Sequence, residues 1–407
     1  MSSSSHSSAE PLRALNLWLI FVILIGLNLR PFLTASGTVA AQISTSLGIP
    51  LGSMAWLTFI PMMIMGIGAF FAPLLRRWIS TRQLTLWGCI VLLLGCALRL
   101  NVSTMNTLML TAVLCGIGVA VLQTLLPGII KQRFPAHVAP VTGVYSACLM
   151  GGGALGAQFT PLLSDWTQSW NWGLGFWAVP VLLALAIAWK ILPRDKDRPA
   201  QTQHSLRHYL RLPRTWLLIA SFGLINAGYA TLVTWLAVYY QSHGWTPTAS
   251  GGLIAVLSVA QAVSALSIPS LAARNKDRRA WLWLVLTCQF LGFLAISYVP
   301  DMAPFAWAII IGFGLGGSFA MAMVVALDHY PDSQRAGILS ALMQGGGFPI
   351  AALAPIIGSW IYAWTGSFKS LWLMHMGFIT VIAVLSYRFQ PEHYPKVMGY
   401  SHQSKAS

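Results

Sequence analysis

The chain of 407 residues is 56% hydrophobic and only 8% charged, with a mean hydropathy of +0.68. Ordinary soluble domains carry about 25% charged residues, so this composition excludes a soluble fold for most of the chain. The formal net charge of +15 would suit a protein that binds nucleic acid. The positions of the basic residues, given below, instead predict a membrane topology and no nucleic-acid partner.

Twelve apolar runs predict twelve helices that span a lipid bilayer. About 20 residues, at about 1.5 Å each, are needed to cross a hydrocarbon core about 30 Å thick. The runs lie at residues 15–39, 52–75, 83–100, 105–130, 140–163, 170–192, 214–240, 248–272, 280–299, 303–327, 336–363 and 369–388. They divide the chain into a tail, a six-helix half, a linker, a second six-helix half and a tail, at residues 1–14, 15–192, 193–213, 214–388 and 389–407.

The lysine and arginine residues predict how these helices are oriented. With the N-terminus in the cytoplasm, 21 of the 24 basic residues fall in cytoplasmic segments, and seven of them lie between Lys190 and Arg214. Arg99 and Lys369 fall outside, and Arg30 falls within the first span. Because cytoplasmic loops carry the excess of basic residues, both termini are expected in the cytoplasm.

The two halves are related by an internal repeat. "GVYSACLMGGGALGAQFTP" at 143–161 matches "GILSALMQGGGFPIAALAP" at 337–355, and Asn28 corresponds to Asn226. Two six-helix halves in parallel repeat are characteristic of major facilitator transporters, which bind substrate near the membrane midplane between the halves. The predicted fold is therefore an all-α membrane protein of the major facilitator type.

Glycine triplets occupy equivalent positions in the two repeats. They comprise Gly151, Gly152, Gly153, Gly345, Gly346 and Gly347. Glycine allows close approach of helix backbones in lipid, so we interpret the triplets as packing or helix-sliding positions, with direct ligand contact as the alternative.

Arg30 is the most informative single residue. It lies inside "WLIFVILIGLNLRPFLTASG" (18–37), directly before Pro31. An arginine deep in a bilayer costs at least about 2.5–3.5 kcal/mol, and no acidic residue falls well inside a long apolar run. Pro31 lacks an amide proton and is expected to kink the helix at this point.

Two interpretations of Arg30 follow. It is either a structural residue bonded to carbonyls or glutamines of neighbouring helices, or a counter-charge for an anionic or strongly polar substrate. Because an unpaired buried charge is costly and no embedded carboxylate is evident, we favour the second. A bound anion would then supply the missing partner.

Other polar residues at the depth of a central cavity are further candidates for substrate binding. The repeat-related Asn28 and Asn226 are the strongest of them, and the remainder are Tyr229, Gln123, Gln261 and Gln344. For the glutamines, hydrogen bonding between helices is the competing interpretation.

His375 is a possible proton carrier, because histidine titrates near neutral pH; a structural role in the last helix is the alternative. The sequence contains no phosphate-binding loop, no nucleophile–base grouping at usable depth and no cluster with metal-ligand spacing. We therefore expect a transporter that is not an enzyme and that carries no metal or cofactor.

Several stretches resemble the bacterial cyanate transporter family, which includes a 2-nitroimidazole exporter. They are "IGLNLRPFLTASG" in the first helix, "LLPGIIKQRFP" after the fourth, "YSACLMGGGALGAQFTP" in the fifth, "FGLINAGYATLVTWLAVYY" in the seventh, "LDHYPDSQRAG" after the tenth and "LMQGGGF" in the eleventh. The resemblance implies a carrier of a small anion or polar molecule in the bacterial inner membrane.

Cyanate is the substrate we expect, carried by alternating access and by a monomer. Its ionised form suits a weakly hydrated guanidinium. Export of small aromatic drugs such as 2-nitroimidazole is the second hypothesis, and a non-transporting sensor built on the same fold is a third. The sequence does not distinguish import from export. It also does not distinguish uniport, anion exchange and proton coupling.

Overall fold

The computed structural model describes residues 12–75, 79–134, 137–193 and 206–399. The predicted N-terminal tail and linker lie largely outside these ranges, as does the end of the C-terminal tail. All regular structure in the described ranges is helical. The first half contains α1 (Leu12–Asn28), α2 (Pro31–Thr38), α3 (Ala40–Leu47), η1 (Leu51–Ala55), α4 (Trp56–Leu75), α5 (Thr81–Leu98), η2 (Arg99–Asn101), α6 (Met105–Arg133), α7 (Val138–Thr167), α8 (Trp170–Gly175) and α9 (Ala178–Ile191).

The second half repeats this pattern after a short helix in the linker. Its elements are α10 (Leu206–Leu210), α11 (Pro213–Ser242), α12 (Pro247–Ala272), α13 (Arg279–Tyr298), α14 (Pro304–Asp328), α15 (Ser333–Thr365), α16 (Phe368–Ser386), η3 (Pro391–His393) and α17 (Tyr394–Met398). In the described ranges, eleven helical segments are long and apolar enough to cross a membrane. The predicted all-α membrane fold is confirmed. The twelfth predicted span corresponds to α7, which has 30 residues but is diluted by five glycines.

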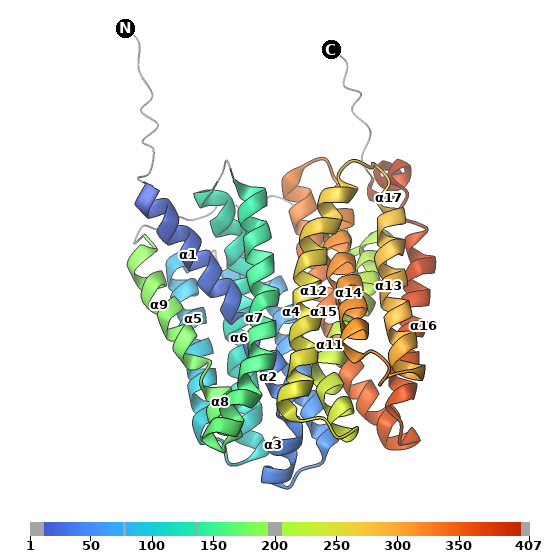
Figure 1. Ribbon diagram of the computed structural model, residues 1–407. Coiled ribbons are helices and arrows are strands. Elements are labelled where there is room, and N and C mark those ends of the chain that lie inside the picture. Colours follow the sequence, from blue (N-terminus) through green and yellow to red (C-terminus); the bar gives the residue numbers. More distant parts are fainter. Residues whose placement is uncertain (1–11, 76–78, 135–136, 194–205, 400–407) are drawn as a thin grey trace, which may run out of the picture.

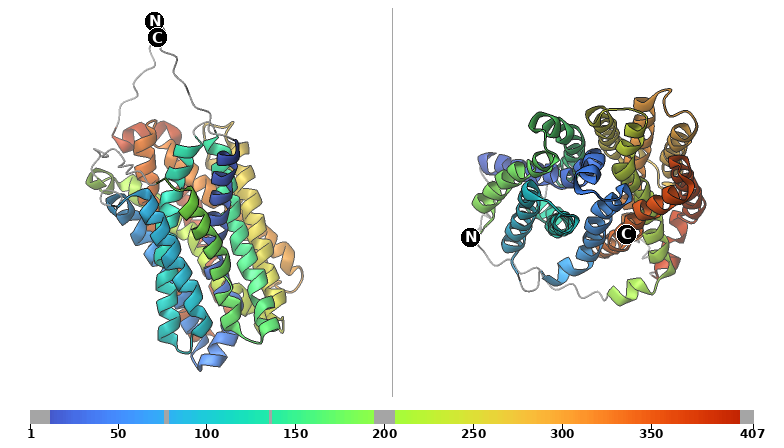
Figure 2. Two further views of the ribbon diagram at one scale, coloured as in Figure 1. Left: turned by 90° about the vertical axis from the view of Figure 1, so that its left-hand side faces the viewer. Right: turned by 90° about the horizontal axis from the view of Figure 1, so that it is seen from below.

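The two halves lie side by side, α1–α9 in one and α11–α16 in the other (Figures 1 and 2). α1 begins at the end of the molecule where α17 lies, and α3 lies at the opposite end; we call these the α17 end and the α3 end. Between the halves, α2 packs against α11, α7 against α12 and α4 against α15. These three pairs bring together the elements that border the centre of the molecule.

The first spanning helix is broken at Arg30, as Pro31 predicted. α1 ends at Asn28, and Arg30 has a non-helical φ of -121° as the residue preceding α2. Pro31 has no N–H for the carbonyl of Leu27, which would accept a hydrogen bond in a continuous helix. The break therefore interrupts the first spanning helix at Arg30, the charged residue inside this span.

Glycines of α7 permit this break to pack closely. A Cβ on Gly152 would overlap the carbonyl oxygen of Leu27, and a Cβ on Gly156 would lie 2.6 Å from the Cα of Pro31. In the second half, Gly346 packs against α11 in the same way, because a Cβ on Gly346 would lie 2.7 Å from the side chain of Ile219. The glycine-rich helix of each half thus supports the first helix of that half.

The halves are in close contact at the α3 end. A Cβ on Gly37 of α2 would overlap the carbonyl oxygen of Val233 of α11. The hydroxyls of Thr58 and Thr234 are hydrogen-bonded at 2.7 Å. Further hydrogen bonds between the halves run from Gln241 to the carbonyl of Thr38 and from Thr248 to the carboxylate of Asp165, each 2.9 Å long. The α3 end is therefore closed in this structure.

Candidate substrate site

Arg30 is buried in the centre of the molecule, with 5% of its surface exposed. Its guanidinium carbon lies 5.2 Å from the ring centre of Tyr229 on α11, which is within the range of a cation–π interaction. Its Nε and Nη1 atoms are buried and have no hydrogen-bond partner. An aromatic ring from the other half therefore stabilises the charge, but two of its donors remain available.

No acidic side chain in the described ranges is paired with Arg30. The described carboxylates lie in loops or near helix ends, at Asp165, Asp277, Asp301, Asp328, Asp332 and Glu392. Leaving donors of a buried charge unsatisfied is unfavourable by about 1–3 kcal/mol or more. A water molecule or a small anion from solution would satisfy them.

Arg30 and Tyr229 border a cavity between the halves, with a volume of about 30 Å³. Its polar wall is completed by Asn226 of α11 and Gln261 of α12. The apolar wall consists of Leu149, Met150, Ile225, Leu315 and Phe319. Since one water molecule needs at least about 10–15 Å³, the cavity holds about two waters or a solute of a few atoms.

Helix geometry explains why Asn226 and Tyr229 both face the cavity. They are three residues apart on α11, and residues at this spacing lie on one helix face. The Asn226 amide donates to the carbonyl of Phe222 in its own helix, 2.8 Å away, which orients the side chain at the cavity wall. The structure thus brings four of the predicted site residues to one place: Arg30, Asn226, Tyr229 and Gln261.

Three other predicted site residues do not line this cavity. Asn28 donates to the carbonyls of Leu24 and Pro180, so it joins α1 to α9 and not to the second half. Gln123 of α6 has a buried amide oxygen without a hydrogen-bond partner, and Gln344 of α15 lies 3.5 Å from the carbonyl of Ser340. The repeat therefore places Asn226, but not Asn28, at the cavity.

His375 also lies away from the cavity. Its ring stacks on Phe293 of α13, with 5.1 Å between the ring centres, and its Nε2 atom is buried without a hydrogen-bond partner. We expect His375→Phe to keep normal uptake, because an aromatic ring is retained against Phe293 and the cavity at Arg30 lies elsewhere. A melting temperature at or above that of the unmodified protein should accompany this, since a buried unsatisfied nitrogen is removed. Loss of proton-driven uptake in this variant would instead support the proton-carrier role.

Arg99 is a second buried arginine that the loop count did not reveal. Its position at the end of the apolar run 83–100 predicted a place outside the membrane, yet its side chain is fully buried. Its guanidinium donates to the carbonyl of Phe32 at 3.0 Å and to the hydroxyl of Thr111 at 3.3 Å. Arg99 therefore ties the end of α5 to α2, directly after the Arg30 break.

The comparison with known proteins decides the family. A model of the Major Facilitator Superfamily matches residues 17–351. The chain belongs to the major facilitator superfamily. It is 35% identical to the cyanate transport protein CynX of Escherichia coli (strain K12), over 93% of this chain and 98% of that protein. This major facilitator protein is therefore a multi-pass membrane transporter from the cyanate transporter branch, as its motifs predicted.

Two further proteins are similar to this major facilitator chain. The 2-nitroimidazole transporter of Escherichia coli (strain K12) is 26% identical over 89% of the chain and 92% of that protein. The crystal structure of a bacterial homologue of the human lysosomal transporter Spinster, inward-facing and unoccupied, matches with a TM-score of 0.78 and 15% identity. That match covers 96% of this chain and 99% of the other, and it shows the shared fold.

Proposed function

We propose that the protein carries a small monovalent anion, cyanate in the first place, across the bacterial inner membrane by alternating access. The observation that supports this most directly is the buried guanidinium of Arg30 at a cavity of about 30 Å³ between the halves, with two donors, Nε and Nη1, that have no hydrogen-bond partner among the described residues. The relative named as a cyanate transport protein supports the same substrate. The solute moves as a single small ion, and one chain of this fold is the transporting unit.

The chemistry of the cavity suits cyanate, a short linear anion. On binding, the ion loses part of its hydration shell and accepts hydrogen bonds from Arg30, whose Nε and Nη1 have no other partner. Arginine is preferred for such pairing because its guanidinium is planar and weakly hydrated. Asn226 and Gln261 provide additional polar contacts, while the apolar wall excludes larger hydrated ions.

We assign the α17 end to the cytoplasm and the α3 end to the periplasm, with both termini inside. The basic residues of the connecting segments support this orientation. In this orientation, the hydrogen bonds of Thr58, Gln241 and Thr248 close the periplasmic side. The structure then represents a state in which the site has been shut off from the outside.

Export of a small aromatic drug is the second candidate function. It is supported by the relative named as a 2-nitroimidazole transporter and by the mostly apolar wall formed by residues such as Leu315 and Phe319. A nitro-substituted ring is larger than the cavity of about 30 Å³ in this conformation. The cavity size therefore favours cyanate.

Uptake of labelled cyanate at alkaline pH into proteoliposomes preloaded with unlabelled cyanate, or with unlabelled 2-nitroimidazole for the second substrate, tests the proposal. We expect time-dependent accumulation above that of protein-free vesicles, and competition by excess unlabelled cyanate but not by 2-nitroimidazole. Vesicles that move labelled 2-nitroimidazole and not cyanate would establish the second function. Vesicles that move neither would rule out both substrates.

A further inference from the structure

A surface groove lies between α13 and α16. These two helices stand at the edge of the molecule away from α1–α9 (Figure 1). Its volume is about 730 Å³. Trp283 and Phe290 of α13 form one wall, and Ile379 and Val384 of α16 form the other. The groove is thus an apolar channel on a face that borders lipid, separate from the cavity at Arg30.

The groove has the length of part of one lipid leaflet. Ile379 and Tyr387 are eight positions apart in the chain, which at about 1.5 Å of rise per residue corresponds to about 12 Å. Half of a hydrocarbon core measures about 15 Å. Since Tyr387 directly follows α16 at the α17 end, the groove runs from the membrane surface inward, parallel to the acyl chains of that leaflet.

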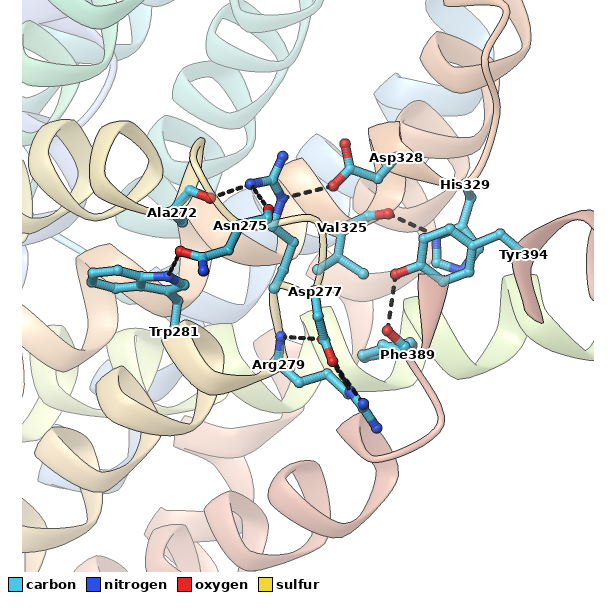
Figure 3. A network of polar contacts seen from close by, with 11 residues as sticks. Ala272, Asn275, Asp277, Arg279, Trp281, Val325, Asp328, His329, Phe389 and Tyr394 are labelled. Carbon is cyan, nitrogen blue, oxygen red and sulfur yellow. Dashed lines mark hydrogen bonds and ion pairs between the residues drawn. The ribbon is translucent and has the colours of Figure 1, made fainter. Parts of the chain in front are cut away.

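A basic residue closes the groove at the membrane surface. Arg388 lines this end, its side chain is exposed, and no acidic side chain among the described residues is paired with it. Two acids at this end of the molecule have other partners: Asp277 is paired with Arg279 at 2.6 Å and Asp328 with Arg278 at 3.0 Å (Figure 3). Glu392, four residues after Arg388, is exposed and makes no ion pair with Arg388. The charge of Arg388 is therefore available to a ligand.

The walls of this end are held in place by contacts that do not use the Arg388 side chain. Trp283 stacks on Tyr387, with an angle of 9° between the rings, and its N–H donates to the Ser386 hydroxyl at 2.7 Å. Arg279 donates to the carbonyl of Tyr387 at 3.1 Å. Tryptophan and tyrosine are typical of the membrane–water interface, so the groove presents a rigid rim at the depth of lipid headgroups.

We propose that this groove binds one anionic phospholipid, with its phosphate on Arg388 and one acyl chain between α13 and α16. An apolar channel alone would accept any acyl chain. The unpaired cation at its mouth adds a preference for a net negative headgroup, as basic pockets between membrane helices do for anionic lipids. The groove shares no lining residue with the cavity at Arg30.

Native mass spectrometry of the purified full-length protein, titrated with phosphatidylglycerol, tests this site. We expect Arg388→Gln to weaken phosphatidylglycerol binding about fivefold, equivalent to about 1 kcal/mol for one basic residue near a membrane surface. Arg388→Lys should retain most of the affinity. Thr380→Phe, an exposed position inside the groove, should weaken binding by blocking the acyl chain.

Lys190→Gln provides the matched control. Lys190 is an exposed cation at the corresponding end of α9 in the first half, so its removal lowers the net charge equally and should leave binding unchanged. Equal weakening by Lys190→Gln and Arg388→Gln would show only a general charge effect and would overturn the site. So would equal affinity of the unmodified protein for phosphatidylglycerol and phosphatidylethanolamine, or normal binding by Thr380→Phe.

Discussion

Replacing Arg30 by glutamine is expected to reduce cyanate uptake by at least about 30-fold. Truncating one partner of a buried charge pair costs about 2–5 kcal/mol, and about 2 kcal/mol corresponds to 30-fold at 25 °C. The reason is that Arg30 is the cation with unsatisfied donors at the cavity. Glutamine keeps a hydrogen-bond donor near the ring of Tyr229 but removes the charge. The measurement is labelled cyanate uptake at equal protein incorporation.

Two comparisons make the Arg30 result interpretable. Arg30→Lys retains the charge but not the planar fork of donors, so its uptake should lie between the glutamine variant and the unmodified protein. His375→Phe, outside the cavity, should behave as unmodified. Equal uptake by Arg30→Gln and the unmodified protein, with matched melting temperatures, would make Arg30 a structural residue.

Replacing Gly37 by valine is expected to prevent closure of the α3 end. Any Cβ at this position meets the backbone of Val233, which cannot rotate away as a side chain can. Overpacking of this kind costs about 1–3 kcal/mol, equivalent to about 5- to 150-fold in the population of the closed state. Cyanate uptake should fall by a comparable factor, because the cycle requires both ends to close in turn.

A cysteine introduced by Thr58→Cys, in a protein whose native cysteines have been replaced, reports whether the α3 end stays open. Thr58 is buried at the closed end, so the cysteine should react with an impermeant maleimide much faster when Gly37 is valine. Gly377→Ala is the matched control, since a Cβ at Gly377 meets nothing within 4 Å. Slow labelling in the Gly37→Val protein would show that the halves close without this contact.

The fold could be predicted almost completely because each sequence pattern that indicates it extends over many residues. Spanning runs are strongly apolar over about 20 residues, and the repeat aligns whole segments such as 143–161 and 337–355. The break at Arg30 could also be predicted, because Pro31 removes a specific backbone donor. The low hydropathy of α7 is explained by its glycines, which permit close packing against α1 and α2.

The site could be predicted only in part, since depth along a helix can be predicted but the direction of each side chain cannot. Asn28 and Asn226 occupy equivalent depths, yet one faces α9 and the other the cavity. Apolar wall residues such as Leu149 and Phe319 carry no signal that separates them from residues facing lipid. Arg99 shows the same limit, because its burial depends on how the end of α5 packs against α2.

If Arg30 holds the transported anion, as proposed, the loaded and empty carriers differ electrically. With a monovalent anion bound, the surroundings of Arg30 are neutral, whereas the empty site carries one positive charge. The electrical work of moving one elementary charge through 100 mV is about 2.3 kcal/mol. An inside-negative voltage therefore draws the empty site toward the cytoplasm and slows its return, while the loaded step is indifferent to voltage. We therefore expect such a carrier to exchange one anion for another more readily than it concentrates one.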